Sequence, residues 1–346
     1  MADDDPKGER VAEEWPVEGH VIVPGSGLEV RRDCLGRSFR SRVRHSTGSY
    51  DLTIGLPQLG RSEELIAPMW DFGPSYESEL AAERSTIRWG EVTSLLDHAY
   101  VFRCGYYATL PASDDRELGE TAWDKFNFEF EFWWEAFTSW AAILASQDLV
   151  GPPEWDWSGP DREGWLIDAH GQRAGFITGK ILTKADSPNH RVLELQDLEA
   201  CVTAAGNQGL PPAPWLLIRD ARSQANAGDD FHGRENLRRA VIDAATAAEL
   251  AMTTLIDKYL DDASVLEPLR KALARSSNNL GGKKAVLNLL RPDLLHERLQ
   301  ENLINKRNKA SHEGKHYSWE EAEAAVDIAT AVVESAYPLA SYLGGG

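Results

Sequence analysis

Hydrophobic and polar residues alternate with a period of two in the first part of the chain, as they do in half-buried strands. The pattern predicts short strands over 17–23, 28–32, 39–45 and 50–56. Glycine-containing turns separate these strands, at 24–27 and 46–48. Farther on, 77–84 has a helical pattern, whereas 85–92 and 98–110 carry β-branched and aromatic residues that are compatible with further strands.

A different pattern begins at residue 118, where aromatic residues recur every three or four positions. This spacing predicts one long amphipathic helix over 118–149. An aromatic face of this kind is typical of a hydrophobic core, and a ligand-binding platform is the alternative. The face is formed by Trp123, Phe126, Phe130, Trp133 or Trp134, Phe137, Trp140 or Ala141, and Leu144.

The next segment returns to short elements. Gly151-Pro152-Pro153 ends the long helix, and a turn at 168–172 joins two expected strands, 164–167 and 174–182, into a hairpin. A helix over 193–205 follows. Residues 1–205 are therefore expected to form an α+β domain. We find no catalytic motif in it, so its role as a sensor, a regulatory module or a partner-binding module stays open.

The remainder of the chain is predicted to be helical. A Gly/Pro-rich linker at 206–214 separates it from the first domain. Helices are expected over 215–227, 233–260, 266–275 and 283–290, then from Pro292 to Gly314, and from a capping box at Ser318 to about residue 340. The fold expected is an α+β N-terminal domain followed by an all-α helical bundle at 215–343.

Composition and charge narrow the class of protein. A hydrophobic fraction of 42% is that of a globular protein. The first residues lack the basic start and apolar core of a signal peptide, and no apolar run approaches the ~20 residues that span a bilayer. Three widely spaced cysteines, Cys34, Cys104 and Cys201, are expected to be buried, reduced thiols. We therefore expect a cytoplasmic protein that does not contact a membrane.

The charge is distributed unevenly. The chain carries a net charge of −19, which disfavours nucleic acid on a uniform surface. Between Arg270 and Lys315, however, eleven basic residues accompany only four acidic ones. A basic segment in an acidic chain is compatible with phosphate binding at one site, and a solvated helical face is the alternative.

One short motif lies in this basic segment. Arg307 and Asn308 are followed by His312, and a long helix containing 238–249 precedes them. This arrangement resembles the HEPN superfamily, whose signature is an arginine, four to six residues and a histidine, with a polar residue after the arginine. The resemblance covers about 130 residues. It implies a HEPN-like bundle, a metal-independent endoribonuclease that leaves a 2′,3′-cyclic phosphate, and a homodimer that joins two motifs in one cleft. It also suggests a toxin–antitoxin or phage-defence role.

These residue types suit RNA cleavage independently of the resemblance to a family. Histidine, with an ordinary pKa of about 6.5, can move the proton of a ribose 2′-hydroxyl. Arginine presents a planar, permanently charged fork to phosphate oxygens, and the amide of Asn308 can orient either partner. RNA-binding candidates are Lys306, Lys309, Lys283 and Lys284, and Glu249 is a possible supporting carboxylate. No cofactor is expected.

Helix geometry complicates a site within one chain. Each residue turns an α-helix by ~100°, so Arg307 and His312 lie about 140° apart. Three explanations stay open: a distorted helix near Gly314, an arginine that wraps around the helix, or a second copy that completes the site.

Other interpretations also stay open. Arg307 and His312 could interact only with the terminal carbonyls of their helix. His312 and His316 are four residues apart, but Gly314 between them argues against a zinc site on one helix, and we expect no metal. The bundle could also be a non-catalytic RNA-binding, nucleotide-binding or dimerisation adaptor, with a protein partner such as an antitoxin on the N-terminal domain.

Overall fold

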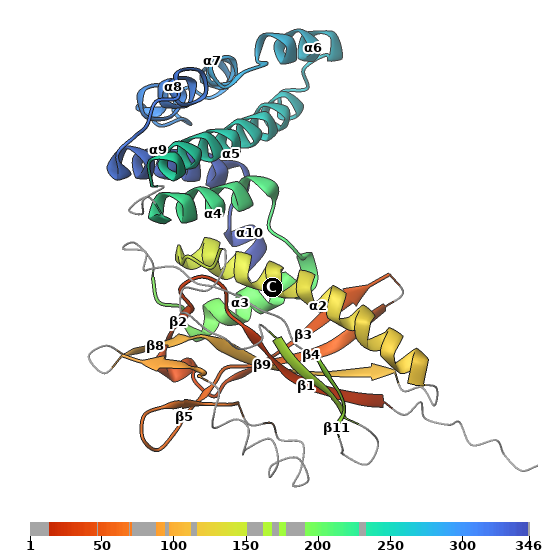
Figure 1. Ribbon diagram of the computed structural model, residues 1–346. Coiled ribbons are helices and arrows are strands. Elements are labelled where there is room, and N and C mark those ends of the chain that lie inside the picture. The colour runs from red at the N-terminus through yellow and green to blue at the C-terminus, as the bar shows by residue number, and fades with distance from the viewer. Residues whose placement is uncertain are drawn as a thin grey trace, which may run out of the picture.

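The computed structural model describes residues 14–46, 48–68, 70, 88–93, 97–111, 116–150, 162–167, 173–177, 191–227 and 233–344. Figure 1 shows an N-terminal region of antiparallel strands and a C-terminal region of helices stacked above it. No helix in these described ranges combines the length and the hydropathy needed to cross a bilayer. The expected helix at 77–84 lies outside the described residues.

A six-stranded antiparallel sheet forms the centre of the N-terminal region. Its strand order is β11-β10-β1-β9-β4-β3. The strands are β1 (Glu14–Ile22), β3 (Ser38–His45), β4 (Gly48–Gly55), β9 (Arg103–Pro111), β10 (Arg162–Ile167) and β11 (Arg173–Ile177). The predicted hairpin is therefore present, and its first strand pairs with β1. Two small sheets adjoin, made of β2 (Leu28–Arg31), β8 (His98–Val101) and β7 (Gly90–Val92), and of β5 (Gln58–Leu59) and β6 (Leu65–Ile66).

The long aromatic helix, α2 (Arg116–Ala145), covers one face of this sheet. Its aromatic face is buried in one core with residues of β1, β3, β4 and β9, so the prediction of a core is confirmed. The indole nitrogens are also used: Trp134 Nε1 donates to the carbonyl of Ile22 at 3.2 Å, and Trp133 Nε1 donates to Ser41 Oγ at 3.0 Å. All three cysteines are buried and free of disulfides.

The opposite face of β1 is buried as well, and it is polar. Glu18 and His20 alternate with the core-facing Val17 and Val21, and all four are buried. On the neighbouring strand β9, the fully buried Arg103 lies against His20, its Nη1 in contact with Nε2 of the imidazole. Burial, together with the charge of Arg103, lowers the pKa of His20 to about 3. His20 is therefore a neutral, structural histidine at physiological pH.

The connection between the two regions is shorter than the expected 206–214 linker. Helix α3 (Leu195–Gln208) belongs to the sheet region and continues to Gln208. Gly209 then adopts a positive φ of 73°, and its carbonyl accepts a hydrogen bond from Trp140 Nε1 at 2.8 Å. Helix α4 (Ala213–Asn226) begins four residues later, with Pro214 in its first turn.

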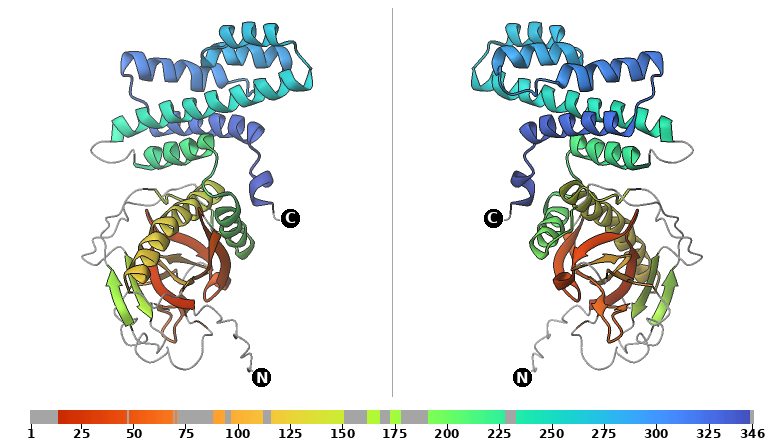
Figure 2. Two further views of the ribbon diagram at one scale, coloured as in Figure 1. Left: turned by 90° about the vertical axis from the view of Figure 1, so that its right-hand side faces the viewer. Right: turned by 90° about the vertical axis from the view of Figure 1, so that its left-hand side faces the viewer.

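The helical region is built around α5 (Gly233–Asp262), which packs against α4, α7 (Leu280–Leu290), α8 (Asn305–Glu313) and α9 (Trp319–Ala336). The buried face of α5 is rich in alanine, which allows neighbouring helices to approach closely. It includes Ala240, Ala244, Ala247, Ala248 and Ala251. Both side views show α5 and α9 crossing the region as long, neighbouring helices (Figure 2).

Two expectations for this region were wrong in detail. The segment from Pro292 to Gly314 is not one helix: residues 292–298 form turns and bends, helix begins at Leu299, and a π-helical turn at Gln300–Ile304 passes directly into α8. The last helix ends at Ala336 because Pro338 follows, and a short helix, α10 (Ala340–Leu343), packs against α3. There the ring of Tyr342 lies 5.6 Å from that of Trp140, so the chain returns to the sheet region near its end.

Candidate functional site

The Arg307–His312 motif lies on α8, and the bundle holds this short helix firmly. Ala310 is buried, and its carbonyl accepts a hydrogen bond from Arg238 Nη1 of α5 at 3.1 Å. The Tyr317 hydroxyl donates to the carbonyl of Lys306 at 2.6 Å. Gly314 then ends the helix in the left-handed conformation, with a φ of 64°. Contacts to backbone carbonyls therefore fix the helix, and the side chains of Arg307, Asn308 and His312 take no part in these contacts.

The motif residues occupy different faces of α8. Asn308 and His312 are one turn apart and both exposed, whereas Arg307 is half-buried beside the buried Ala310. The Arg307 guanidinium reaches toward Asn308, whose Oδ1 accepts a hydrogen bond from Nη1 at 3.4 Å. The helix is regular from Asn305 to Glu313, so a distorted helix does not bring Arg307 and His312 to one face.

Arg307 and Lys309 of α8, and the imidazole of His312, have no ion-pair partner in the part of the chain that the structure describes. Several other cations of the helical region are paired directly, at Arg238–Glu235, Arg270–Asp261, Lys271–Glu267 and Lys283–Glu249. Exposed cations such as Lys258 and Arg275 resemble those of α8 in having no ion pair among these residues. In a chain of net charge −19, unpaired positive charge on one small helix is a feature suited to an anion.

Three of the four lysines expected to contact RNA, Lys306, Lys283 and Lys284, are engaged within the chain instead. Lys306 Nζ donates to the carbonyl of Glu321 at 3.0 Å, and partial burial lowers its pKa. Lys283 Nζ lies 2.9 Å from the Glu249 carboxylate and is only 13% exposed. Both contacts link neighbouring helices, which sequence spacing alone does not reveal. Lys309 is exposed on α8.

The structure does not bring Glu249 to the motif. Glu249 lies about 16 Å along α5 from Arg238, the residue of that helix that contacts α8. Lys284 is nearer to α8, because its Nζ donates to Gln300 Oε1 at 3.1 Å, and Gln300 Nε2 donates to Asn305 Oδ1 at 3.0 Å. Lys284 is therefore the α7 lysine that is linked, through Gln300, to the start of α8.

The π turn before α8 is a feature that the sequence analysis missed. It buries Leu303 and Ile304 as adjacent residues and passes directly into α8. The extra residue of a π turn shifts the phase of the helix that follows, and such turns are frequent at functional sites. No residue type in this segment signals the turn, and both Leu303 and Ile304 pack in the core of the helical region.

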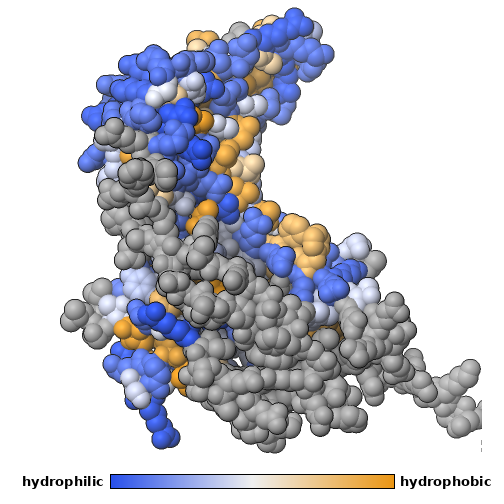
Figure 3. Space-filling model, viewed as in Figure 1, coloured by the Kyte–Doolittle hydropathy of each residue, from blue (hydrophilic) through white to orange (hydrophobic). Residues whose placement is uncertain are grey.

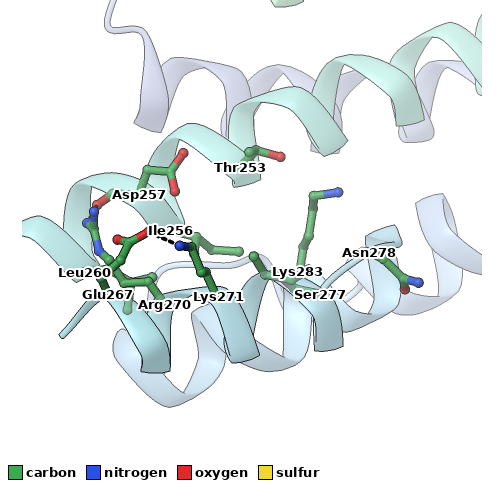
Figure 4. Close-up of a pocket in the computed structure, with 11 residues that line it drawn as sticks. Thr253, Ile256, Asp257, Leu260, Glu267, Arg270, Lys271, Ser277, Asn278 and Lys283 are labelled. Atoms are coloured by element: carbon green, nitrogen blue, oxygen red, sulfur yellow. Dashed lines mark hydrogen bonds and ion pairs between the residues drawn. The ribbon is translucent and has the colours of Figure 1, made fainter. Parts of the chain in front are cut away.

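A pocket of about 380 Å3 lies at the other end of the bundle, between α5, α6 (Glu267–Ser276) and α7. Figure 4 shows Lys283 rising from α7 toward α5, and Lys271 beside Glu267 on α6. The charged groups of this pocket are largely paired: Arg270 also donates to the carbonyl of Asp257 at 3.1 Å. The pocket thus offers less free positive charge than the exposed face of α8.

No cluster of three or more histidine, cysteine or acidic side chains suited to a metal ion occurs among the described residues. No protein-family model matches the chain, and no curated protein or solved structure is significantly similar to it.

Proposed function

We propose that the chain is a HEPN-type, metal-independent endoribonuclease that cleaves RNA at a composite site in a cytoplasmic homodimer. The observation that carries this proposal is that α8 presents Arg307, Lys309 and His312 without an acidic partner among the described residues. These are the side chains of the Arg–Asn–His motif and its nearest lysine.

The reaction assigns a step to each group. His312 takes the proton from the ribose 2′-hydroxyl, and the resulting oxygen attacks the adjacent phosphorus. Arg307 stabilises the negative charge that develops on the phosphate oxygens, and Asn308 orients the guanidinium through the hydrogen bond described above. The bond from phosphorus to the 5′-oxygen breaks, and a second histidine protonates that oxygen. The products are a 2′,3′-cyclic phosphate and a 5′-hydroxyl.

The need for a second histidine and the geometry of α8 favour two copies of the chain. Within one chain, Arg307 and His312 project from an ordinary helix about 140° apart, so they do not converge on one phosphate. Two α8 helices meeting face to face place an arginine from one copy near a histidine from the other. We therefore propose that dimerisation occurs through the helical region.

Cleavage of mixed RNA in EDTA tests the activity. We expect wild-type protein to cut, and Arg307→Ala and His312→Ala to lose at least about 100-fold in rate. Lys271→Ala, a cation on α6 away from the motif, is the control and should keep wild-type activity. Activity that survives in both motif variants would exclude the proposed site.

Mixing the two inactive variants tests the composite site. A heterodimer of Arg307→Ala and His312→Ala chains retains one arginine and one histidine on opposite copies. Proton abstraction and phosphate stabilisation are then restored, but the second histidine is missing and water must protonate the 5′-oxygen, so only a small part of the activity should return. A site contained within one chain gives no recovery. A strictly monomeric wild-type protein in a solution mass measurement would also contradict the composite site.

A non-catalytic adaptor is the second candidate, and one observation favours it. Phe128 and Phe132 are exposed on α2, where their rings form an edge-to-face pair 4.8 Å apart. Such a pair suits a protein partner of the sheet region, an antitoxin for example. In either case the sheet region acts as a sensor or regulatory module, and a toxin or phage-defence effector is the role we propose for the nuclease.

A further inference from the structure

A second pocket, of about 320 Å3, lies where the end of α2 meets α4 and α9. Its size is at the lower end of small-molecule sites, and its position between two regions of the chain is typical of such sites. The residues on which the argument depends are Ser146 at the end of α2, Arg222 and Asn226 on α4, and Trp319 and Asp327 on α9.

Three charged side chains line this pocket, Arg222, Glu323 and Asp327, and Arg222 and Asp327 do not form an ion pair with each other. Arg222 Nη1 donates to the carbonyl of Ile143 at 3.2 Å, and Nη2 donates to Thr330 Oγ1 at 3.5 Å. Asp327 has no hydrogen bond or ion pair with the residues that the structure describes, although it feels the charge of Arg222. Partial burial raises the pKa of Asp327 and lowers that of Arg222. Asp327 is nevertheless exposed at the rim of the pocket, whereas Arg222 is half-buried, so a ligand that accepts from Arg222 and donates to Asp327 can use both groups.

The other lining residues favour a planar ligand with polar edges. Trp319 contributes an indole ring, which can stack on a flat ring system, and Asn226 contributes an amide that both donates and accepts. Ser146 has a φ of 54°, an uncommon conformation for a non-glycine residue. Strained residues of this kind gather at ligand sites, although a helix end also explains this one.

We propose that this junction pocket binds a guanine nucleoside. Guanine carries an acceptor, O6, directly beside two donors, N1–H and the 2-amino group. O6 accepts from Arg222, the two donors bind the Asp327 carboxylate, and the ring stacks on Trp319. Adenine has an amino group in place of O6 and no hydrogen on N1, so it reverses both interactions and binds poorly.

The pocket is also connected to α8. Trp319 opens α9, and in the same turn the carbonyl of Glu321 accepts the hydrogen bond from Lys306, the residue before Arg307. A nucleoside stacked on Trp319 therefore contacts the first turn of α9, which is hydrogen-bonded to α8 through Lys306. This inference goes beyond the nuclease proposal, and the binding itself does not depend on it.

Calorimetric titration of the full chain with guanosine and with adenosine tests the pocket. Guanosine should bind saturably and at least about tenfold more tightly than adenosine. Asp327→Asn should weaken guanosine binding at least about tenfold, because one donor then faces an amide rather than a carboxylate. Asp262→Asn removes the same charge from an exposed position on α5 and should leave binding unchanged.

Guanosine should also raise the thermal midpoint of the wild-type protein and not that of Asp327→Asn, which separates lost binding from lost folding. Absence of guanosine binding, equal affinity for adenosine, or unchanged binding in Asp327→Asn would each overturn the inference. All measurements are made without RNA, so these outcomes leave the nuclease proposal to its own test.

Discussion

The sheet region and the helical region place their charged side chains differently. In the sheet region, Glu18, Glu29, Arg103 and Asp148 are buried. No charged side chain is fully buried in the helical region, as far as the structure describes it, and Figure 3 shows a largely hydrophilic surface there in this view. Buried charges depend on their neighbours for stability, whereas exposed charges can be changed at little cost. We therefore expect substitutions in the first region to affect folding, and substitutions on α8 to affect function.

Truncation of Arg103 should have the largest effect on stability. Arg103→Ala removes a fully buried large side chain, with an expected loss of about 3–5 kcal/mol in the free energy of unfolding, measured in urea. Arg103→Met keeps most of the volume without the charge, so it should recover much of this loss. If both variants were as stable as wild type, buried charge would not distinguish the two regions.

Acid should destabilise the sheet region through His20. The folded-state pKa of about 3, which burial and Arg103 lower, is below the unfolded value of about 6.5. The unfolded state therefore binds a proton that the folded state does not, and stability falls as pH decreases from about 6.5 toward 3. The expected loss at pH 5 is about 2 kcal/mol. His20→Gln should remove this part of the pH dependence, which is measured as the difference in the free energy of unfolding between pH 7.5 and pH 5. An equal difference in the variant and in the wild-type protein would contradict the assignment to His20.

Loss of the α9 cap should have a smaller effect. Ser318 Oγ accepts from the backbone N–H of Glu321 at 3.3 Å, and the Glu321 carboxylate accepts from the N–H of Ser318 at 3.1 Å. Ser318→Ala should therefore lower the free energy of unfolding by about 1 kcal/mol. Ser335→Ala, near the other end of the same helix, provides the control and should change stability less. Equal losses would show that the cap contributes no more than an ordinary helix position.

Lys309→Ala should have the smallest effect on stability, within about 0.5 kcal/mol, because the side chain is exposed and unpaired among the described residues. Its RNA affinity should nevertheless fall, and the dependence of binding on salt should become shallower by about one unit of slope. Binding titrations at several salt concentrations measure both changes. A variant that binds RNA as wild type does would remove α8 from the proposed interface.

Local sequence patterns predicted most of the helices and strands, because the formation of these elements depends largely on neighbouring residues. The alternation over 39–45, the aromatic spacing of α2 and the capping box at Ser318 each depend on residues close in sequence, and each was confirmed. Pro338 also signalled the end of α9, although the sequence analysis extended that helix past it. The π turn carried no such signal.

The candidate site was less predictable, because its contacts join residues that are distant in the chain. The motif residues were identified, and α8 is the helix expected to carry them. The engagement of Lys306 by Glu321 and of Lys283 by Glu249 depends on how α7, α8 and α9 pack. Arg222 and Asp327 line the same junction pocket although more than 100 residues separate them in the chain, so no sequence pattern marks their proximity.

The return of the chain to the sheet region through α10 has a mechanical consequence. Two connections, at 209–212 and 337–339, join the regions, and α10 packs against α3 beside the first of them. Hydrogen bonds from Arg219 and Arg222 of α4 to Ser139 and Ile143 of α2 add a further tie beside the contact between Trp140 and Tyr342. The two regions are therefore held together at several points, and a load on one region is shared between both connections.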